Sequence, residues 1–166
     1  SDASGTSLLD VGGRKWSQEM LDALEWPLSW LPEVTESTEA TAKVSQAASE
    51  STGLPEGTPV IAGGGDQAAQ AVGCGIVREG MVSATLGTSG VVFAQSDEYR
   101  VEPQGKLHAF CHAVPGKWHL MGVMLSAAGS FQWYKNQLGR EEQAIEDNGG
   151  ENAYDLLTAA AQDVPP

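Results

Sequence analysis

The chain has 166 residues, which is enough for one ordinary domain with a sizeable hydrophobic core. Its 22 acidic residues outnumber its 9 basic residues and give a formal net charge of −13. Such a surface repels nucleic acids and anionic membranes, so neither is an expected partner, although backbone amides and Mg²⁺ can still hold a phosphate locally. No apolar run approaches the roughly 18 residues that a membrane span requires.

The two cysteines do not support a disulfide framework. Cys74 and Cys111 lack CxxC spacing, and two thiols are too few to staple a small secreted domain. Reduced thiols in a cytoplasmic protein fit this usage best.

The two ends of the chain predict an internal fragment of a longer protein. The first residue is Ser1, inside what reads as a turn and a strand, and residues 164–166 directly follow an amphipathic segment without a partner. Half of a functional site is therefore expected to lie outside these residues.

Residues 1–31 predict short, mixed elements. SDASGT is turn chemistry, and the apolar residues at 8–11 read as a strand that Gly12–Gly13 breaks. Ser17 is suited to cap a helix with apolar residues at helical spacing, and Pro27 ends that helix. The apolar positions of this helix are Met20, Leu21, Leu24 and Trp26.

The stretch from 32 to 59 is rich in Ser, Thr, Glu and Ala, a composition that leaves disorder open as an alternative. A short strand is nevertheless expected over 40–44, followed by a helix over 45–52 that ends at Gly53. We place a domain boundary near residue 58.

From residue 59 onward, strands and helices alternate more regularly. The segment 59–62 reads as a buried strand, and turns at Gly87–Gly90 and Pro115–Gly116 predict two hairpins. Further strands are expected at 80–86, 90–95, 108–113 and 118–125, and helices at 67–72, 126–138 and 154–161. This mixture of hairpins and helices predicts an α/β or α+β fold.

Asp66 lies behind three glycines, at the start of an alanine-rich run. One interpretation is a helix N-cap, since an aspartate there complements the helix dipole. The other is functional, because glycines let a substrate come near and a carboxylate can take a proton from a hydroxyl that attacks a phosphoryl group. The local sequence leaves both interpretations open.

The turn Gly87-Thr88-Ser89-Gly90 follows an apolar, strand-like segment. It fits an ordinary hairpin turn, and it also fits a phosphate-binding turn with free backbone amides and two hydroxyls. It matches neither the G-x-x-x-x-G-K-[ST] loop nor the G-x-S-x-G elbow, so a P-loop enzyme and an α/β-hydrolase are disfavoured.

Three histidines and a cysteine raise the question of a metal site. His108 and His112 share one face of the proposed hairpin, but Cys111 points away and no second ligand cluster closes a tetrahedral site. We expect these side chains, with His119, to pack in the core or beside a pocket, and we assign no metal ligand. The same core role is expected for Trp118, Met121, Met124, Phe131 and Trp133.

Four segments together resemble the FGGY family of carbohydrate kinases and, within it, the xylulokinases. They occur in family order and with family-like spacing over essentially the whole chain. The segments are SDASGTSLLDVGGRKWS, GLPEGTPVIAGGGDQAAQAVGCG, VSATLGTSGVVFA and LHAFCHAVPGKWHLMGVMLSAAGSFQW. The resemblance implies part of an actin-like ATPase fold of the ribonuclease H type, an α/β fold whose two lobes enclose ATP and a sugar. It implies that residues 1–57 end the first, sugar-binding lobe and residues 58–166 begin the nucleotide-binding lobe.

The resemblance also implies roles for individual residues. Asp66 matches the catalytic base that activates the sugar hydroxyl, and Gln67 matches a residue beside the sugar. Gly87, Thr88 and Ser89 match a turn that contacts the phosphates of ATP. Two further positions, in the segment AAGSFQW, match residues that approach the nucleotide in related glycerol kinases: Ala128 and Gln132.

The function implied by the resemblance is ATP- and Mg²⁺-dependent phosphorylation of a ketopentose, D-xylulose, by a cytoplasmic enzyme. The family's N-terminal aspartate motif and its adenine-binding segment are absent from these residues, so the chain alone is expected to be inactive. Alternatives are a kinase for ribulose, gluconate or glycerol, and a non-catalytic actin-like module that binds sugar or nucleotide. A homodimer also stays open, because an unpaired strand edge can pair with a second copy.

Overall fold

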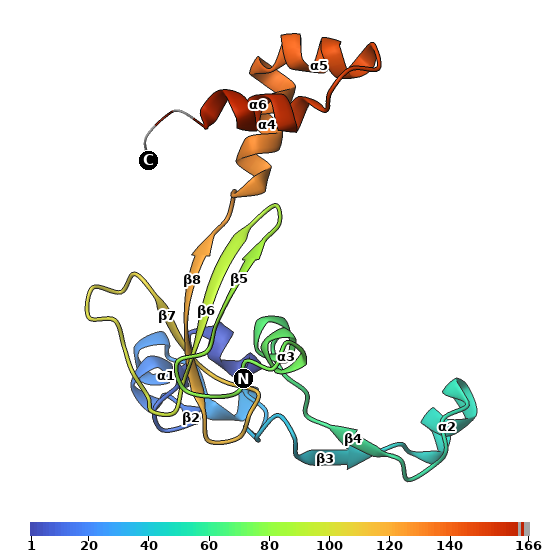
Figure 1. Cartoon of the computed structure of the whole chain (residues 1–166). Helices are drawn as coiled ribbons and strands as arrows, with labels where there is room; N and C mark the ends of the chain where they lie inside the picture. Colours follow the sequence, from blue (N-terminus) through green and yellow to red (C-terminus); the bar gives the residue numbers. More distant parts are fainter. Residues whose placement is uncertain (163, 165–166) are drawn as a thin grey trace. The chain divides into compact units, whose positions relative to one another are not determined.

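We describe a computed structural model that covers residues 1–162 and 164 (Figure 1). The chain forms two compact units. The first comprises Ser1–Ser83 and Val92–Gly122, and the second comprises Ala84–Val91 and Val123–Pro166. Helices and strands occur together, which confirms the predicted α/β character.

The first unit begins with short elements that the sequence partly predicts. They are the 3₁₀ helix η1 (Asp2–Thr6), strands β1 (Leu9–Asp10) and β2 (Lys15–Trp16), helix α1 (Gln18–Leu24) and the 3₁₀ helix η2 (Leu28–Trp30). Ser17 caps α1 as predicted, with its hydroxyl accepting the Met20 amide at 3.3 Å. The helix ends earlier than expected, because Glu25 takes a left-handed conformation (φ 56°) and Trp26 lies beyond the helix.

A two-stranded arm follows, formed by β3 (Ala40–Lys43) and β4 (Pro59–Ile61) with helix α2 (Gln46–Thr52) between them. The predicted helix is confirmed at both ends, since Ser45 caps it and Gly53 (φ 77°) terminates it. The prediction of a buried strand at 59–62 was wrong. All of β4 is exposed, because its sheet in the described part of the chain consists of β3 and β4 alone.

A four-stranded sheet has the order β5-β6-β8-β7 and confirms both predicted hairpins. Its strands are β5 (Val82–Leu86), β6 (Gly90–Ser96), β7 (His108–Cys111) and β8 (Trp118–Met124). Strands β7 and β8 are antiparallel, with Phe110 opposite His119. The core of the first unit gathers Phe93 of β6 with Ala71 of helix α3 (Asp66–Gly73) and with Ile76.

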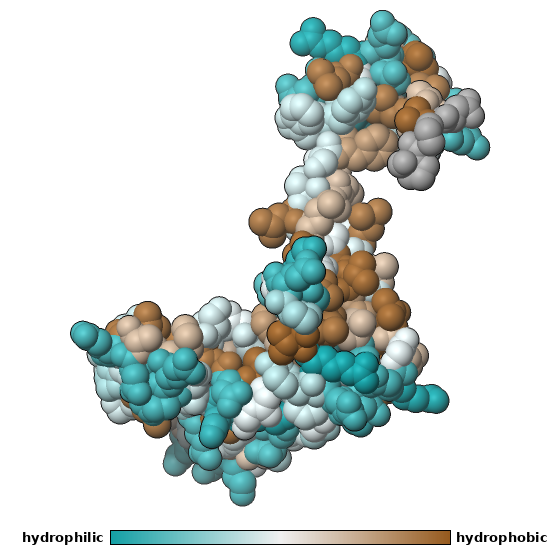
Figure 2. Space-filling model, turned by 90° about the vertical axis from the view of Figure 1, so that its left-hand side faces the viewer, coloured by the Kyte–Doolittle hydropathy of each residue, from teal (hydrophilic) through white to brown (hydrophobic). Residues whose placement is uncertain are grey.

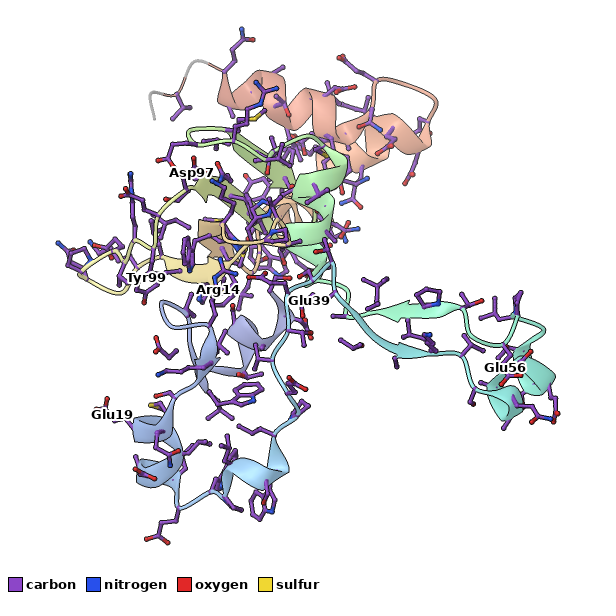
Figure 3. The ribbon with its side chains drawn as sticks, turned by 90° about the horizontal axis from the view of Figure 1, so that it is seen from below. Arg14, Glu19, Glu39, Glu56, Asp97 and Tyr99 are labelled. Atoms are coloured by element: carbon purple, nitrogen blue, oxygen red, sulfur yellow. The ribbon has the colours of Figure 1, made fainter. Side chains whose placement is uncertain are left out.

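Arg14 connects the start of the chain to the β7–β8 hairpin within the first unit (Figure 3). Its guanidinium donates to Glu36 Oε1 at 2.6 Å and to the Lys117 carbonyl at 2.7 Å, and it lies 4.4 Å from the centre of the Trp118 ring. The Cys111 amide also donates to Ser4 Oγ, at 3.0 Å. The hydrogen bond between Ser4 and Cys111 fixes η1 against β7, which positions Asp2 for the site described below.

The described residues of the second unit form three helices: α4 (Ala128–Leu138), α5 (Arg140–Asp147) and α6 (Ala153–Ala161). Helices α4 and α6 confirm the predicted segments, but α5 was not expected. The ammonium of Lys135 on α4 joins these helices, since it lies 3.3 Å from Glu146 Oε2 of α5 and 4.5 Å from the centre of the Tyr154 ring of α6.

Apolar side chains are exposed on both units (Figure 2). Trp30 is 68% exposed in the first unit, and Leu125 is 83% exposed in the second. The core assignments made from sequence hold for Met121, which is buried, and fail for Met124 and Trp133, which are exposed. No helix in the described ranges combines the length and apolar character needed to cross a membrane.

Candidate active site

Asp66 is the first residue of α3, and its side chain is exposed. Its Oδ1 accepts the Gln67 amide at 2.8 Å, so the carboxylate does complement the first turn. The N-cap itself is Gly65, which corrects the interpretation of Asp66 as the cap. Asp66 Oδ2 accepts no hydrogen bond from the residues that the structure describes.

The three glycines before Asp66 serve two different needs. Gly63 has a left-handed backbone (φ 80°), which favours glycine. At Gly64, a Cβ would lie 2.9 Å from Ser1 Oγ and 3.2 Å from Ala113 Cβ. The missing side chain at Gly64 thus lets Ser1 and Ala113 of the protein itself pack against the backbone, rather than a substrate. The neighbouring Gly65 amide donates to Ser1 Oγ at 3.1 Å.

A small pocket of about 130 Å³ lies beside Asp66 within the first unit. Gln67 lines it too, so the structure brings together the two residues predicted to contact a sugar. The wall also contains Asp2 from η1, Phe110 from β7, and His119 and Met121 from β8. A place beside a pocket was expected for His119, but sequence reasoning assigned none of these four residues to the site of Asp66. The alternation of His119 and Met121 along β8 was visible in the sequence. The position of all four residues beside Asp66 depends on long-range contacts.

His112 is fully buried, and both of its ring nitrogens have partners. Nδ1 accepts the Val114 amide at 2.9 Å, so Nε2 carries the proton and donates to the Ile76 carbonyl at 3.0 Å. Burial lowers the pKa of His112, although the hydrogen bond to Ile76 acts in the opposite direction. The imidazole is therefore neutral and structural.

His119 is also buried, but its ring nitrogens have no partner among the residues that the structure describes. Its ring stacks on Phe93 with 4.1 Å between centroids and meets Phe110 edge-on at 5.9 Å. Burial, with a smaller contribution from His112, lowers the pKa of His119 to about 3. The packing role predicted for His112 and His119 is confirmed, and the described ranges contain no group of three metal-ligating side chains.

The turn of residues 87–90 packs against the start of α4 within the second unit. The Thr88 carbonyl accepts the amides of Ala127 at 2.8 Å and Gly129 at 3.2 Å, and the Gly87 carbonyl accepts the Ala128 amide at 3.0 Å. The hydroxyl of Ser89 donates to the Leu125 carbonyl at 3.0 Å. Inside this unit, the amides of Thr88 and Ser89 donate to no acceptor on the described residues. The turn therefore presents two backbone amides and the exposed Thr88 hydroxyl.

A second pocket, of about 380 Å³, lies beside this turn. It is lined by Thr88, Ala128 and Gln132, so three of the five residues predicted to contact a nucleotide share one pocket. Phe131 and Tyr154 complete its wall, with ring centroids 5.1 Å apart. Phe131 had been assigned to the core, and Tyr154 carried no signal in the sequence because it reaches the pocket from α6.

Comparison with known proteins places these features in one family. Residues 1–73 match the N-terminal domain of the FGGY family of carbohydrate kinases, and residues 82–166 match its C-terminal domain. The first match includes Asp66 and Gln67, and the second includes the 87–90 turn and the 380 Å³ pocket.

Three similar proteins illustrate the match. The xylulose kinase of Escherichia coli K12 is 45% identical over 162 residues, which is 98% of this chain and 31% of that protein. The xylulose kinase of Klebsiella pneumoniae is 44% identical over 133 residues, covering 80% of this chain and 27% of that protein. A solved structure of a "xyloylose kinase" from Brucella ovis superimposes with a TM-score of 0.80 at 40% identity, covering 92% of this chain and 31% of that structure.

The chain thus spans about three tenths of the length of these relatives. Both halves of the chain match the family, and the structure has the corresponding part of the actin-like fold of sugar kinases. The chain therefore belongs to the FGGY family of carbohydrate kinases.

Proposed function

We propose that this chain is part of an ATP-dependent kinase that converts D-xylulose to D-xylulose 5-phosphate. The observation that carries the proposal is the 45% identity to a xylulose kinase over 98% of the chain. Pocket contacts discriminate closely similar sugars, such as ribulose and D-xylulose, by only a few kcal/mol, so the proposal needs a direct test that also includes gluconate and glycerol.

Asp66 is the general base of the proposed reaction. A primary hydroxyl of the sugar forms a bond to the γ-phosphorus of ATP, the bond from that phosphorus to the bridging oxygen breaks, and ADP leaves. Asp66 Oδ2 takes the hydroxyl proton, while Oδ1 stays bound to the Gln67 amide. Gln67, on the same pocket, orients the hydroxyl.

The residues proposed to bind ATP lie in the second unit. The amides of Thr88 and Ser89 donate to its phosphate oxygens, because backbone donors in a turn form an anion-binding concavity. Gly87 lets the backbone come close, and Ala128 and Gln132 line the neighbouring pocket that receives the nucleotide. Charge-assisted bonds to phosphate are about twice as strong as neutral ones, which favours this use of the turn.

Mg²⁺ is expected to enter with ATP rather than on a site of this chain. The described residues offer no cluster of three side chains that could ligate it, so we assign no step to it here. The division into a first lobe (1–57) and a second lobe (58–166) remains a prediction, as do a cytoplasmic location and a homodimer. Residues 163, 165 and 166 lie outside the described residues.

The test is a substrate panel on the complete kinase. ADP release would be followed with Mg·ATP against D-xylulose, L-ribulose, glycerol and gluconate. We expect kcat/KM for D-xylulose to exceed the others by at least about tenfold, the margin that a pocket contact provides. Preference for another member of the panel would reassign the substrate, and turnover of none would favour a non-catalytic binding module.

A further inference from the structure

Two buried histidines of the first unit differ in one respect that packing does not explain. His112 uses both ring nitrogens, in bonds to Val114 and Ile76, whereas His119 uses neither within the described residues. His119 is nevertheless only 3% exposed. A buried polar group without a partner destabilises a fold, and buried groups of this kind mark places where a ligand or water supplies the missing bond.

The position of His119 indicates what supplies that bond. It lies on β8 two residues before Met121, so both side chains point to the same face of the strand, and both line the pocket beside Asp66. Phe93 stacks on the ring and Phe110 meets it edge-on, which holds the imidazole in one orientation. The unpartnered nitrogens thus belong to a side chain fixed in the wall of the proposed sugar pocket.

The protonation state of the imidazole restricts the ligand chemistry. A neutral imidazole offers one donor and one acceptor, and a hydroxyl group can serve both. An anion is a poor occupant, because the carboxylates of Asp2 and Asp66 line the same pocket. A cation would need further ligands, and no metal-binding group is found in the ranges described. A neutral polyol fits these requirements best.

We propose that His119 is a specificity-determining residue that hydrogen-bonds one hydroxyl of the sugar, directly or through one water. This inference rests on the proposed function, since it assigns the sugar to the pocket beside Asp66. His119 leaves the proton transfer to Asp66 and selects the sugar by pairing with a hydroxyl other than the one that reacts.

The central experiment replaces His119 by Phe in the complete kinase. Phenylalanine keeps the stack on Phe93 and removes both unpartnered nitrogens, so the variant is expected to unfold at the same or a higher temperature than the wild type. The sugar KM is expected to rise by about tenfold or more, while the KM for ATP stays within about twofold. A residue that only fills the core would change neither constant.

Two further variants complete the design. His119→Gln restores one donor and one acceptor, and its sugar KM should lie between those of the wild type and His119→Phe. His108→Phe makes the same substitution on the exposed histidine of β7, which does not line the pocket. It should leave both KM values unchanged.

A measurement on the wild type removes any dependence on variant folding. The ring-nitrogen NMR signals of His119 should shift on addition of D-xylulose and not on addition of ATP alone. A folded His119→Phe variant with unchanged sugar KM would overturn the proposal, and so would unmoved ring signals at saturating sugar. Turnover of no sugar by the wild type would count against the proposed function, whereas sugar-dependent ring shifts would still support the role of His119.

Discussion

The start of α3 and the start of α4 each lie beside a glycine-containing turn and differ in what they expose. The turn at residues 63–65 directly precedes α3, whereas the turn at residues 87–90 is distant in sequence and bonds to the start of α4. At the start of each helix, at least one amide already has an acceptor within the chain. At α3 the acceptor is the Asp66 side chain, and an exposed carboxylate oxygen is left over. At α4 the acceptors are the Gly87 and Thr88 carbonyls, and the amides of the turn are left over.

This difference supports the proposal of a proton acceptor beside one glycine turn and an anion site at the other. A free helix N-terminus is a ready anion site, yet α4 does not use its own amides in this way. Its first-turn amides hold the turn in place, and the turn presents donors of its own. The two regions should therefore respond to different substitutions, and the following predictions test that separation from the largest expected effect to the smallest.

The largest effect is expected for Asp66→Asn. The amide keeps the size of the side chain and can still accept the Gln67 amide, but it cannot take a proton. We expect kcat of the complete kinase to fall by about 10²- to 10⁴-fold, the contribution of a positioned general base. The KM for ATP should change by less than about twofold, because the proposed phosphate contacts lie in the other region.

The measurement is steady-state kinetics with D-xylulose, together with thermal unfolding. The unfolding temperature should be unchanged, since Asp66 is exposed. Near-normal kcat in Asp66→Asn would reduce the role of Asp66 to its bond in the first turn of α3.

A second prediction concerns the pH dependence of stability. It should be larger in the first unit, because all three histidines of the chain lie there. The unfolded chain binds protons below about pH 6.5, while folded His119, with its pKa lowered to about 3, does not. Its contribution to stability is therefore complete above pH 6.5 and is lost as the pH falls toward 3. At pH 5 the expected loss from His119 is about 2 kcal/mol, and His112 acts in the same direction.

Hydrogen exchange of the complete kinase, corrected for intrinsic rates, would measure this effect region by region. Amides of β6, β7 and β8 should lose protection between pH 7 and pH 5, while those of α4–α6 should lose much less. His119→Phe should reduce the pH dependence in the first unit. Equal losses of amide protection in both regions would show that the histidines do not control the pH dependence of stability.

Gly129→Ala tests the turn at α4. A Cβ at this position would lie 3.0 Å from Thr88 Cγ2 and 3.1 Å from the Thr88 carbonyl oxygen, so the turn must shift. We expect the KM for ATP to rise by about tenfold, roughly 1.4 kcal/mol, with the sugar KM unchanged. Gly73→Ala on α3 is the matched control, because its Cβ would meet no atom within 4 Å. A larger effect on the sugar KM than on the ATP KM would contradict the separation of the two regions.

Sequence reasoning succeeded where the signal is local. Ser45 and Gly53 bound α2 because caps act through their own neighbours. The family motifs assigned Asp66 and Gln67 to the sugar and Thr88 and Gln132 to the nucleotide, and the structure places each pair on one pocket. Whether these residues perform the assigned roles stays a prediction.

Other features required the structure, because long-range contacts create them. Asp2 reaches the first pocket since η1 is tied to β7 through Ser4 and Cys111. Helix α5 escaped prediction because it begins at once after Gly139, which also ends α4 and reads as a helix stop. Its first turn does carry Glu141 and Glu142, a usable signal for a helix start.

The smallest effect is expected for Ser89→Ala. The hydroxyl donates to the Leu125 carbonyl at 3.0 Å. Loss of this hydrogen bond should weaken the packing of the turn against the segment before α4 by about 1 kcal/mol. The proposed phosphate contact of this residue is its backbone amide, which alanine keeps. We therefore expect the KM for ATP to rise by less than about threefold, well below the effect of Gly129→Ala. A rise as large as that of Gly129→Ala would mean that the Ser89 hydroxyl leaves Leu125 and binds a phosphate oxygen when ATP is present, so that the turn rearranges on binding.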